Sequence, residues 1–177
     1  MRSWLALWIG MICVTETAAC SCYEKSPVKE AHAEADLVVV GRVVRLSYVG
    51  LAETMRETKR AQVASKVAPE KGHLLTGTWI AKVEMEIEQS FKGSPATGRV
   101  VVYTGRMSAS CGYTQFKVGK KFVVYGRQRS DFYRLVTSDG ALREGLEKPG
   151  TYWTNHCLRT TPFSAGEVAA LKEIKKG

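Results

Sequence analysis

The clearest hydrophobic pattern in the chain is an alternation at residues 83–88 within the segment KVEMEIEQSF, residues 82–91. Apolar residues and glutamates take turns, so that each kind points to one side of an extended segment. A period of two predicts a β-strand with one buried face and one solvent-facing face. The residues expected on the buried face are Val83, Met85 and Ile87.

Four further segments have the composition of strands. Residues 36–48 form a long β-branched run that contains Gly41, and a glycine inside a strand indicates a bulge or a sharp bend. Residues 99–104, 121–126 and 131–137 follow, separated by turns that contain glycine. The sequence therefore predicts five strands.

Two amphipathic segments bracket the strands and predict helices. SPVKEAHAEA has Ser26 as a cap and Pro27 in the first helical position. SAGEVAALKEIKK has a capping box formed by Ser164 and Glu167. We therefore expect a mainly β fold: a five-stranded closed barrel of the OB type, with a short amino-terminal helix and a carboxy-terminal helix.

The start of the chain has the features of an export signal. A positive Arg2 precedes the apolar run WLALWIGMICV, and small residues lead up to Ala19. The run is shorter than the roughly 20 residues that a membrane anchor needs. We expect residues 1–19 to be a signal peptide and residues 20–177 to be one secreted or periplasmic domain. The alternative is a bacterial lipoprotein acylated at Cys20.

Cysteine usage fits an exported protein. Of the five cysteines, Cys13 leaves with the signal, which leaves Cys20, Cys22, Cys111 and Cys157. An even number in an exported chain predicts disulfides, and Cys20 and Cys22 are too close in sequence to suit a bond with each other. We expect each of the two to reach one of the distant cysteines, which would fix the amino terminus to the body of the protein.

The formal net charge of +9 suggests an anionic partner outside the cell, such as an acidic polysaccharide or an anionic surface. A basic, polar segment, residues 50–77, interrupts the strand pattern and predicts a long loop with some helical content. Its cations could hold such a polyanion: Lys59, Arg60, Lys66 and Lys71. The alternative is a solvated loop without a ligand.

No enzyme motif is present, and we expect neither a catalytic activity nor a cofactor. The three histidines match no metal-ligand spacing. OB folds also bind nucleic acid through aromatic residues on a basic face, but an export signal argues against that partner. Aromatic residues that alternate along strands are more often part of a core.

Four stretches together resemble the netrin-like domain: CSC, EAHAEADLVVVGRVV, SASCGYTQFKVGKKFVVYG and HCLRTTPFSAGEVAAL. Within this family the chain is most similar to the inhibitory domain of the tissue inhibitors of metalloproteinases, in particular to short bacterial chains of that type. The resemblance covers residues 20–177 except the insertion at residues 50–77. It departs from the family at about Ala33, where a further cysteine is usual.

The resemblance implies two disulfides, Cys20 with Cys111 and Cys22 with Cys157. It also implies a function, namely inhibition of a zinc metalloprotease by a monomer. The α-amine and carbonyl of Cys20 would chelate the zinc of the protease, because a catalytic zinc keeps one position open. Ser21 would enter the specificity pocket.

The same resemblance assigns a second contact edge to Ala109 and Ser110, next to Cys111. Many netrin-like domains inhibit no protease. The alternative function is therefore a non-inhibitory extracellular or periplasmic module that binds polyanions or a protein through its basic surface.

Overall fold

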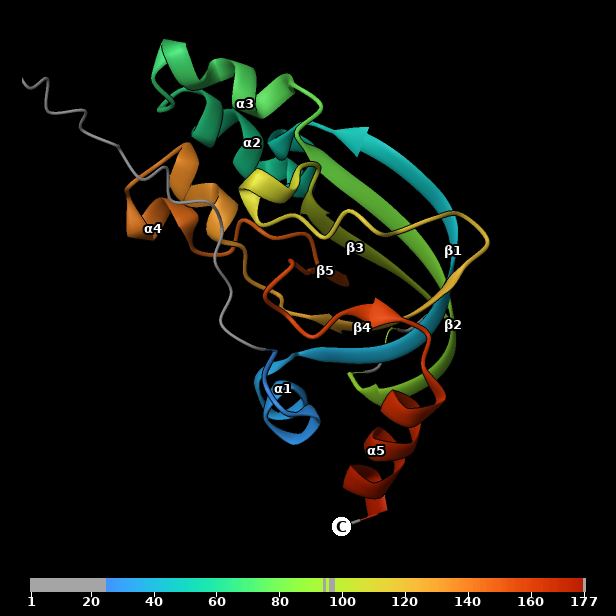
Figure 1. The fold of residues 1–177 in the computed structure, drawn as a ribbon. Coiled ribbons are helices and arrows are strands. Elements are labelled where there is room, and N and C mark those ends of the chain that lie inside the picture. Colours follow the sequence, from blue (N-terminus) through green and yellow to red (C-terminus); the bar gives the residue numbers. More distant parts are fainter. Residues whose placement is uncertain (1–24, 94, 96–97, 177) are drawn as a thin grey trace, which may run out of the picture.

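The computed structural model describes residues 25–93, 95 and 98–176. A six-stranded sheet dominates the fold, in the order β5-β3-β2-β1-β4-β6. The two longest strands, β1 and β2, curve together along the molecule (Figure 1). The strands are β1 (Leu37–Val49), β2 (Ile80–Lys92), β3 (Arg99–Gly105), β4 (Lys121–Gly126), β5 (Thr151–Trp153) and β6 (Thr161–Pro162).

Every strand pair is antiparallel except β3 with β5, which is parallel. The predicted alternation of β2 is confirmed, because Val83 and Met85 are fully buried while Glu86 and Glu88 are exposed. The predicted irregularity at Gly41 is also confirmed by a register shift between Val40 and Gly41 in the β1–β2 ladder. A Cβ at Gly41 would lie 2.8 Å from the Glu86 carbonyl oxygen, so the bend depends on glycine.

The expectation of a five-stranded closed barrel is wrong. The sheet has six strands and does not close. Arg127, the residue after β4, and Trp153 of β5 form one isolated bridge, where they exchange two backbone hydrogen bonds of 2.8 and 2.7 Å. β5 has three residues, too few to extend this bridge into a ladder. No disulfide joins two cysteines of the described residues, and the expected partners Cys20 and Cys22 lie outside them.

The fifth predicted strand, residues 131–137, is instead the 3-10 helix η4 (Asp131–Leu135). The Ser130 side chain accepts a hydrogen bond from the Phe132 amide and starts the turn. The turn then buries Tyr133, whose hydroxyl lies 3.0 Å from the Thr54 hydroxyl. A helical turn is favoured in this segment because it places Phe132, Tyr133 and Val136 against the same core.

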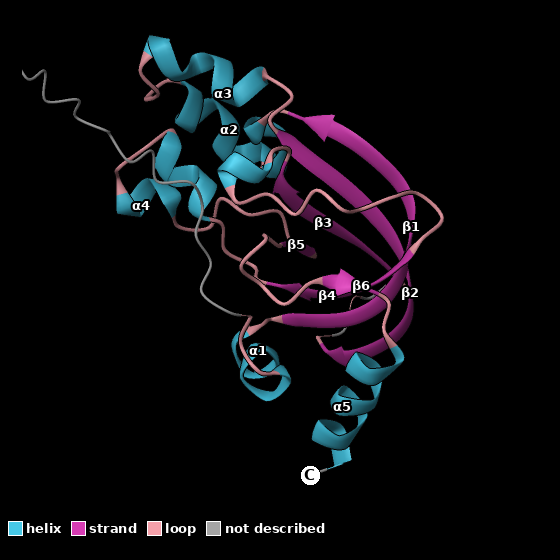
Figure 2. Ribbon diagram, viewed as in Figure 1, coloured by secondary structure: helices cyan, strands magenta, loops and turns pink. Residues whose placement is uncertain are grey.

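The insertion is folded and not a bare loop. It forms η1 (Leu51–Thr54), α2 (Glu57–Ala64), η2 (Pro69–Lys71) and α3 (Gly72–Thr76). Figure 2 shows these helices gathered at one end of the sheet, near α4 (Gly140–Arg143). Leu51, Met55, Val63 and Leu75 are buried in a core that they share with Tyr133 and Trp153. The helical content is thus confirmed, and its cause is this second core.

Helices α1 (Val28–Glu34) and α5 (Ala165–Lys176) pack together at the other end of the sheet (Figure 1). They cover Val38, Val40 and Tyr125, which explains why β1 starts with an uninterrupted apolar run. α1 begins one residue later than predicted, after Pro27, and has no side-chain cap. No helix in the described ranges is long and apolar enough to cross a membrane.

Candidate functional site

Two loops meet at one side of the sheet and bring Cys111 and Cys157 close together. The His156 amide donates a 2.8 Å hydrogen bond to the Cys111 carbonyl oxygen, which places the two cysteine backbones in adjacent segments. Both cysteines are disulfide-bonded. We call this region, residues 107–112 and 154–158, the cysteine site.

The first loop is a compact turn built on one carbonyl group. The Met107 carbonyl oxygen accepts hydrogen bonds from the Ser110 amide at 3.1 Å, the Ser110 hydroxyl at 2.8 Å and the Gly112 amide at 3.0 Å. The result is η3 (Ser108–Ser110), which leaves Ala109 exposed and Ser110 half-buried. Two of the residues that sequence predicts for a contact edge are therefore on the surface beside Cys111.

Cys111 itself has a strained backbone. Its φ of 56° is in the left-handed region, and no other non-glycine residue in the described part of the chain has a positive φ. Such a conformation costs about 1–3 kcal/mol and persists where the surroundings enforce it. The next residue, Gly112, is closely packed against the end of β3, because a Cβ there would lie 1.9 Å from the Gly105 carbonyl oxygen.

The second loop presents Cys157 through an asparagine turn. The Asn155 side-chain oxygen accepts hydrogen bonds from the Cys157 amide at 2.9 Å and the Leu158 amide at 2.8 Å. Thr154 secures the start of this loop, since its hydroxyl lies 2.6 Å from the Thr160 hydroxyl in a buried position. Sequence reasoning overlooked Asn155, although an asparagine side chain commonly forms a turn by bonding to the backbone two residues further along the chain.

The structure describes a further network beside the cysteine site, which sequence reasoning also missed. Arg159 forms two hydrogen bonds with the Glu167 carboxylate, at 2.6 and 2.8 Å. A third nitrogen of Arg159 donates to the Ser26 carbonyl oxygen at 2.8 Å. The Tyr125 hydroxyl donates to Glu167 at 2.6 Å. The predicted capping box is therefore only half formed, with the Glu167 amide 3.5 Å from the Ser164 hydroxyl.

This network shifts the pKa of each of its three titratable groups. Burial acts to raise the pKa of Glu167, but the hydrogen bonds from Arg159 and Tyr125 outweigh burial, and the net pKa lies below the usual range. The hydrogen bonds to Glu167 raise the pKa of Arg159. Burial and the adjacent carboxylate raise the pKa of Tyr125. The ion pair is thus fully charged at neutral pH.

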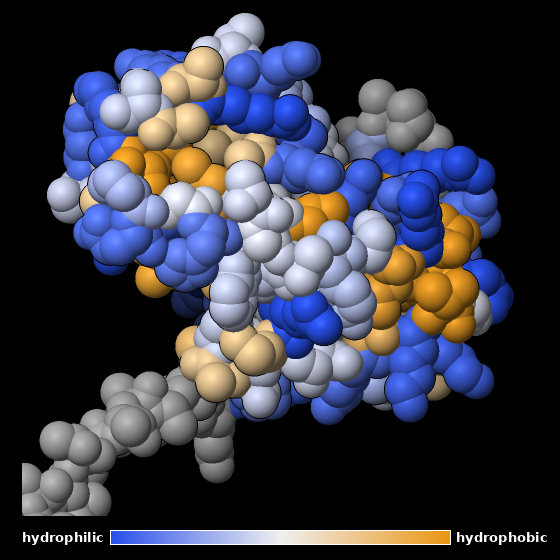
Figure 3. All heavy atoms as spheres, turned by 90° about the horizontal axis from the view of Figure 1, so that it is seen from above, coloured by the Kyte–Doolittle hydropathy of each residue, from blue (hydrophilic) through white to orange (hydrophobic). Residues whose placement is uncertain are grey.

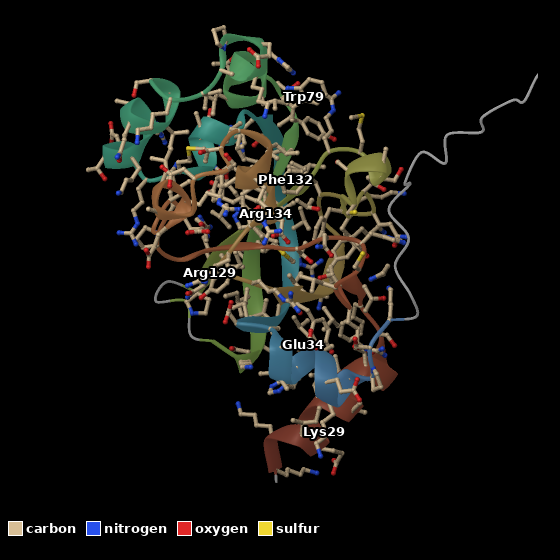
Figure 4. All side chains as sticks on the ribbon, turned by 90° about the vertical axis from the view of Figure 1, so that its left-hand side faces the viewer. Lys29, Glu34, Trp79, Arg129, Phe132 and Arg134 are labelled. Carbon is tan, nitrogen blue, oxygen red and sulfur yellow. The ribbon has the colours of Figure 1, made fainter. Side chains whose placement is uncertain are left out.

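A hollow of about 320 Å³ adjoins the cysteine site, and Ser110 and Cys111 form part of its wall. Phe132, Leu135, Trp153 and Leu158 supply apolar lining. A larger hollow of about 730 Å³ lies on the side where Figure 4 shows Glu34, Arg129 and Arg134. Both arginines and carboxylates line this hollow, so its charges favour neither an anionic nor a cationic ligand.

The face of the molecule that carries the insertion is mostly hydrophilic, with hydrophobic areas scattered between the polar ones (Figure 3). Three large apolar side chains near the end of β3 are about half exposed: Tyr48, Trp79 and Met107. The Arg106 guanidinium lies 4.6 Å from the centre of the Tyr48 ring. Met107 immediately precedes η3, so this exposed apolar surface adjoins the cysteine site.

The aromatic residues that could have formed a stacking face are mostly in the core. Tyr103, Phe122, Tyr125 and Tyr133 are at most 2% exposed, and burial raises the pKa of Tyr103 to about 12.

No group of three or more His, Cys, Asp or Glu side chains within the described ranges is arranged to hold a metal. Neither a known family model nor a curated protein matches the sequence.

Proposed function

We propose that the protein is an exported inhibitor of zinc metalloproteases, and that the amino terminus at Cys20 is its zinc-binding group. The observation that carries the proposal is the 2.8 Å hydrogen bond from the His156 amide to the Cys111 carbonyl oxygen. It brings together the two cysteines that the netrin-like resemblance pairs with Cys20 and Cys22.

The spacing of the cysteines supports bonds from Cys20 and Cys22 to Cys111 and Cys157 in either order. Two residues of extended chain span about 7 Å, so Cys20 and Cys22 can bond only to cysteines that are close neighbours in space. Cys111 and Cys157 fulfil this condition although 45 residues separate them in the chain. Both are disulfide-bonded, as the proposal requires.

The chemistry follows from a terminus that begins at Cys20. A free α-amine has a pKa of about 8 and loses its proton readily beside a metal ion. With the neighbouring carbonyl oxygen it forms a bidentate ligand, which fills the open position of a catalytic zinc. The sulfur atom takes no part as a ligand, because the disulfide holds it. Two disulfides to adjacent loops keep the amine rigid, which lowers the entropy lost on binding.

The described loop provides the second half of the contact surface. Ala109 is exposed and Ser110 is half-buried, and both lie beside Cys111 in η3 and at its end. Ser21 would lie between this edge and the zinc, in the specificity pocket.

One added alanine tests the mechanism. We would produce the mature chain from Cys20 and a second chain with alanine ahead of Cys20, and measure inhibition of a panel of purified zinc metalloproteases. A third chain with alanine after Gly177 is the matched control. The proposal predicts inhibition by the mature and control chains, and its loss in the chain extended at Cys20, which no longer has an amine beside the chelating carbonyl.

Equal inhibition by all three chains would overturn the chelation mechanism. Absence of inhibition by the mature chain across the panel would favour the alternative of a basic binding module. That alternative predicts retention on a heparin column that falls steeply with salt and ignores the added alanine.

A further inference from the structure

The carboxy-terminal half of β1 forms an open edge of the sheet. β4 pairs with β1 only as far as Arg42, and the last backbone hydrogen bonds on that side join Val43 to the loop before β4. On the other side, β2 continues beside β1 as far as Val49. Figure 1 shows this half of β1 at the outer margin of the sheet, beyond the end of β4. Within the described part of the chain, residues 44–48 therefore have a neighbouring strand on one side only.

The hydrogen-bond pattern of β2 shows which residues of this edge are already paired. In an antiparallel sheet, successive residues of a central strand turn their backbone groups to opposite neighbours. The Ile87 amide donates to the Gly98 carbonyl oxygen, and the β2–β3 register has no shift, so the odd-numbered residues of β2 face β3. The even-numbered residues face β1, where the register places them opposite Arg45, Ser47 and Val49.

Two residues of the edge, Leu46 and Tyr48, present unpaired backbone groups. They alternate with the residues that bond to β2, so their N–H and C=O groups point to the open side. No described residue forms a hydrogen bond with these groups on that side. The side chains of Val44 and Tyr48 are 37% and 46% exposed, so the edge is open to solvent. A row of unpaired N–H and C=O groups is a template for a further strand.

The side chains along the edge are mainly cationic. The Arg45 side chain is 70% exposed, and its ion-pair partner Glu84 is 4.0 Å away. At one end of the edge, the Arg106 guanidinium lies 4.6 Å from the centre of the Tyr48 ring. At the other end, Lys120 is exposed and forms no ion pair with a described residue. The excess of positive charge repels a second copy of this chain, whose net charge is also +9, and attracts an acidic segment.

We propose that residues 44–48 of β1 are a docking edge for an extended, acidic segment of a partner protein, which adds to the sheet as a further strand. Main-chain hydrogen bonds to Leu46 and Tyr48 hold the segment, as in other complexes formed by strand addition. Its acidic side chains pair with Arg45 and with Arg106. The proposal does not depend on the proposed function, since the docking edge contains no residue of the cysteine site.

Titration of the ¹⁵N-labelled protein with the peptide acetyl-EVTVEVT-amide tests the proposal. The matched control peptide is acetyl-KVTVKVT-amide, which has the same apolar residues and the opposite charge. We expect saturable binding of the acidic peptide, at least about tenfold tighter than that of the basic peptide. Bound peptide should slow the amide hydrogen exchange of Leu46 and Tyr48 at least about tenfold. The exchange of Ser47, whose amide faces β2, should not change.

Two substitutions at Tyr48 separate backbone pairing from side-chain contact. Tyr48→Val and Tyr48→Pro both remove the ring, but only proline removes the amide N–H, and proline is tolerated at a strand edge whose N–H faces solvent. We expect Tyr48→Pro to bind the acidic peptide at least about tenfold more weakly than Tyr48→Val, as for the loss of one backbone hydrogen bond. Circular dichroism melting checks that both variants fold, and if Tyr48→Pro does not, the exchange rates of the wild type decide.

Three results would overturn the proposal. The first is absence of saturable binding of the acidic peptide up to about 1 mM, the range of a weak complex. The second is binding that both Tyr48 variants weaken equally, or that leaves the exchange of Leu46 unchanged, because the peptide would then contact side chains and not the edge. The third is a dimer of the protein without peptide, seen by size-exclusion chromatography and lost in Tyr48→Pro, because a second copy would then occupy the edge.

Discussion

Replacing Gly112 by alanine tests whether the Cys111 loop depends on close contact with the end of β3. An alanine Cβ would lie 1.9 Å from the Gly105 carbonyl oxygen, 2.5 Å from the Gly105 carbonyl carbon and 2.8 Å from the Met107 carbonyl oxygen. All three are backbone atoms, so no side-chain rotation can relieve the clash. The loop itself must move, and Cys111 moves with it.

The structure sets the size of the expected effect. Extra atoms forced into a packed site cost about 1–3 kcal/mol, and each kcal/mol lowers the melting temperature of a domain of this size by about 2–4 °C. We therefore expect Gly112→Ala to lower the melting temperature by about 2–12 °C, measured by circular dichroism with the disulfides intact. Inhibition should weaken as well, because the contact edge at Ala109 and Ser110 shifts.

Gly72→Ala is the matched control. Nothing lies within 4 Å of the added Cβ, and the Gly72 backbone is helical with φ −55° and ψ −34°. Alanine in a helix is favoured over glycine by about 0.5–1 kcal/mol, so this variant should melt at or above the wild-type temperature. If Gly112→Ala melts as the control does, the described packing of the Cys111 loop is wrong.

Three further substitutions test other parts of the fold. Leu171→Ala should lower the free energy of unfolding by about 2–5 kcal/mol in a denaturant titration, since Leu171 is a fully buried residue of α5; a loss under about 1 kcal/mol would contradict that packing. Val63→Asp should expose the insertion to limited proteolysis, whereas Lys66→Asp should not, because Val63 is fully buried and Lys66 is exposed. Glu167→Gln tests pH dependence: because the folded pKa of Glu167 is lowered, its stabilisation is complete above the unfolded pKa of about 4.3 and is lost as the pH falls through the folded value. The difference in unfolding free energy between wild type and Glu167→Gln should thus be constant from about pH 5 to 7 and shrink at lower pH, and a difference that grew on acidification would refute it.

Local patterns predicted most of the sheet because the burial of these strands follows their own sequence. The alternation around Val83 and Met85 marks one buried face, and the apolar run that starts at Leu37 is buried on both faces, under α1 and α5 as well as inside the sheet. The Gly41 irregularity was also predictable, since a glycine within a β-branched run has few other uses.

Tertiary contacts decided what the local patterns could not. Residues 131–137 have the composition of a strand. They form a helical turn instead, because that turn places the Tyr133 hydroxyl next to the Thr54 hydroxyl in the insertion. The true fifth strand, Thr151–Trp153, is too short to produce a periodic signal. The sequence predicted a long loop for the insertion because its buried residues are few and widely spaced along a polar segment.

The candidate site stays a prediction. The resemblance assigned Ala109, Ser110 and Cys111 to one contact edge, and the structure puts the segment of Cys157 beside Cys111. The residues Cys20, Ser21 and Cys22 lie outside the described residues, so the chelating end remains a proposal. Arg159 was beyond sequence reasoning, because its partners come from three distant segments and one of them is a backbone carbonyl.

The most direct test of the central claim is disulfide mapping of the naturally exported chain by mass spectrometry of its non-reduced peptides. The account predicts a chain that starts at an unmodified Cys20, with Cys20 linked to Cys111 and Cys22 linked to Cys157. A bond between Cys111 and Cys157, an acylated Cys20 or a different first residue would contradict it, because each of these removes the amine from the position where it could bind a zinc ion.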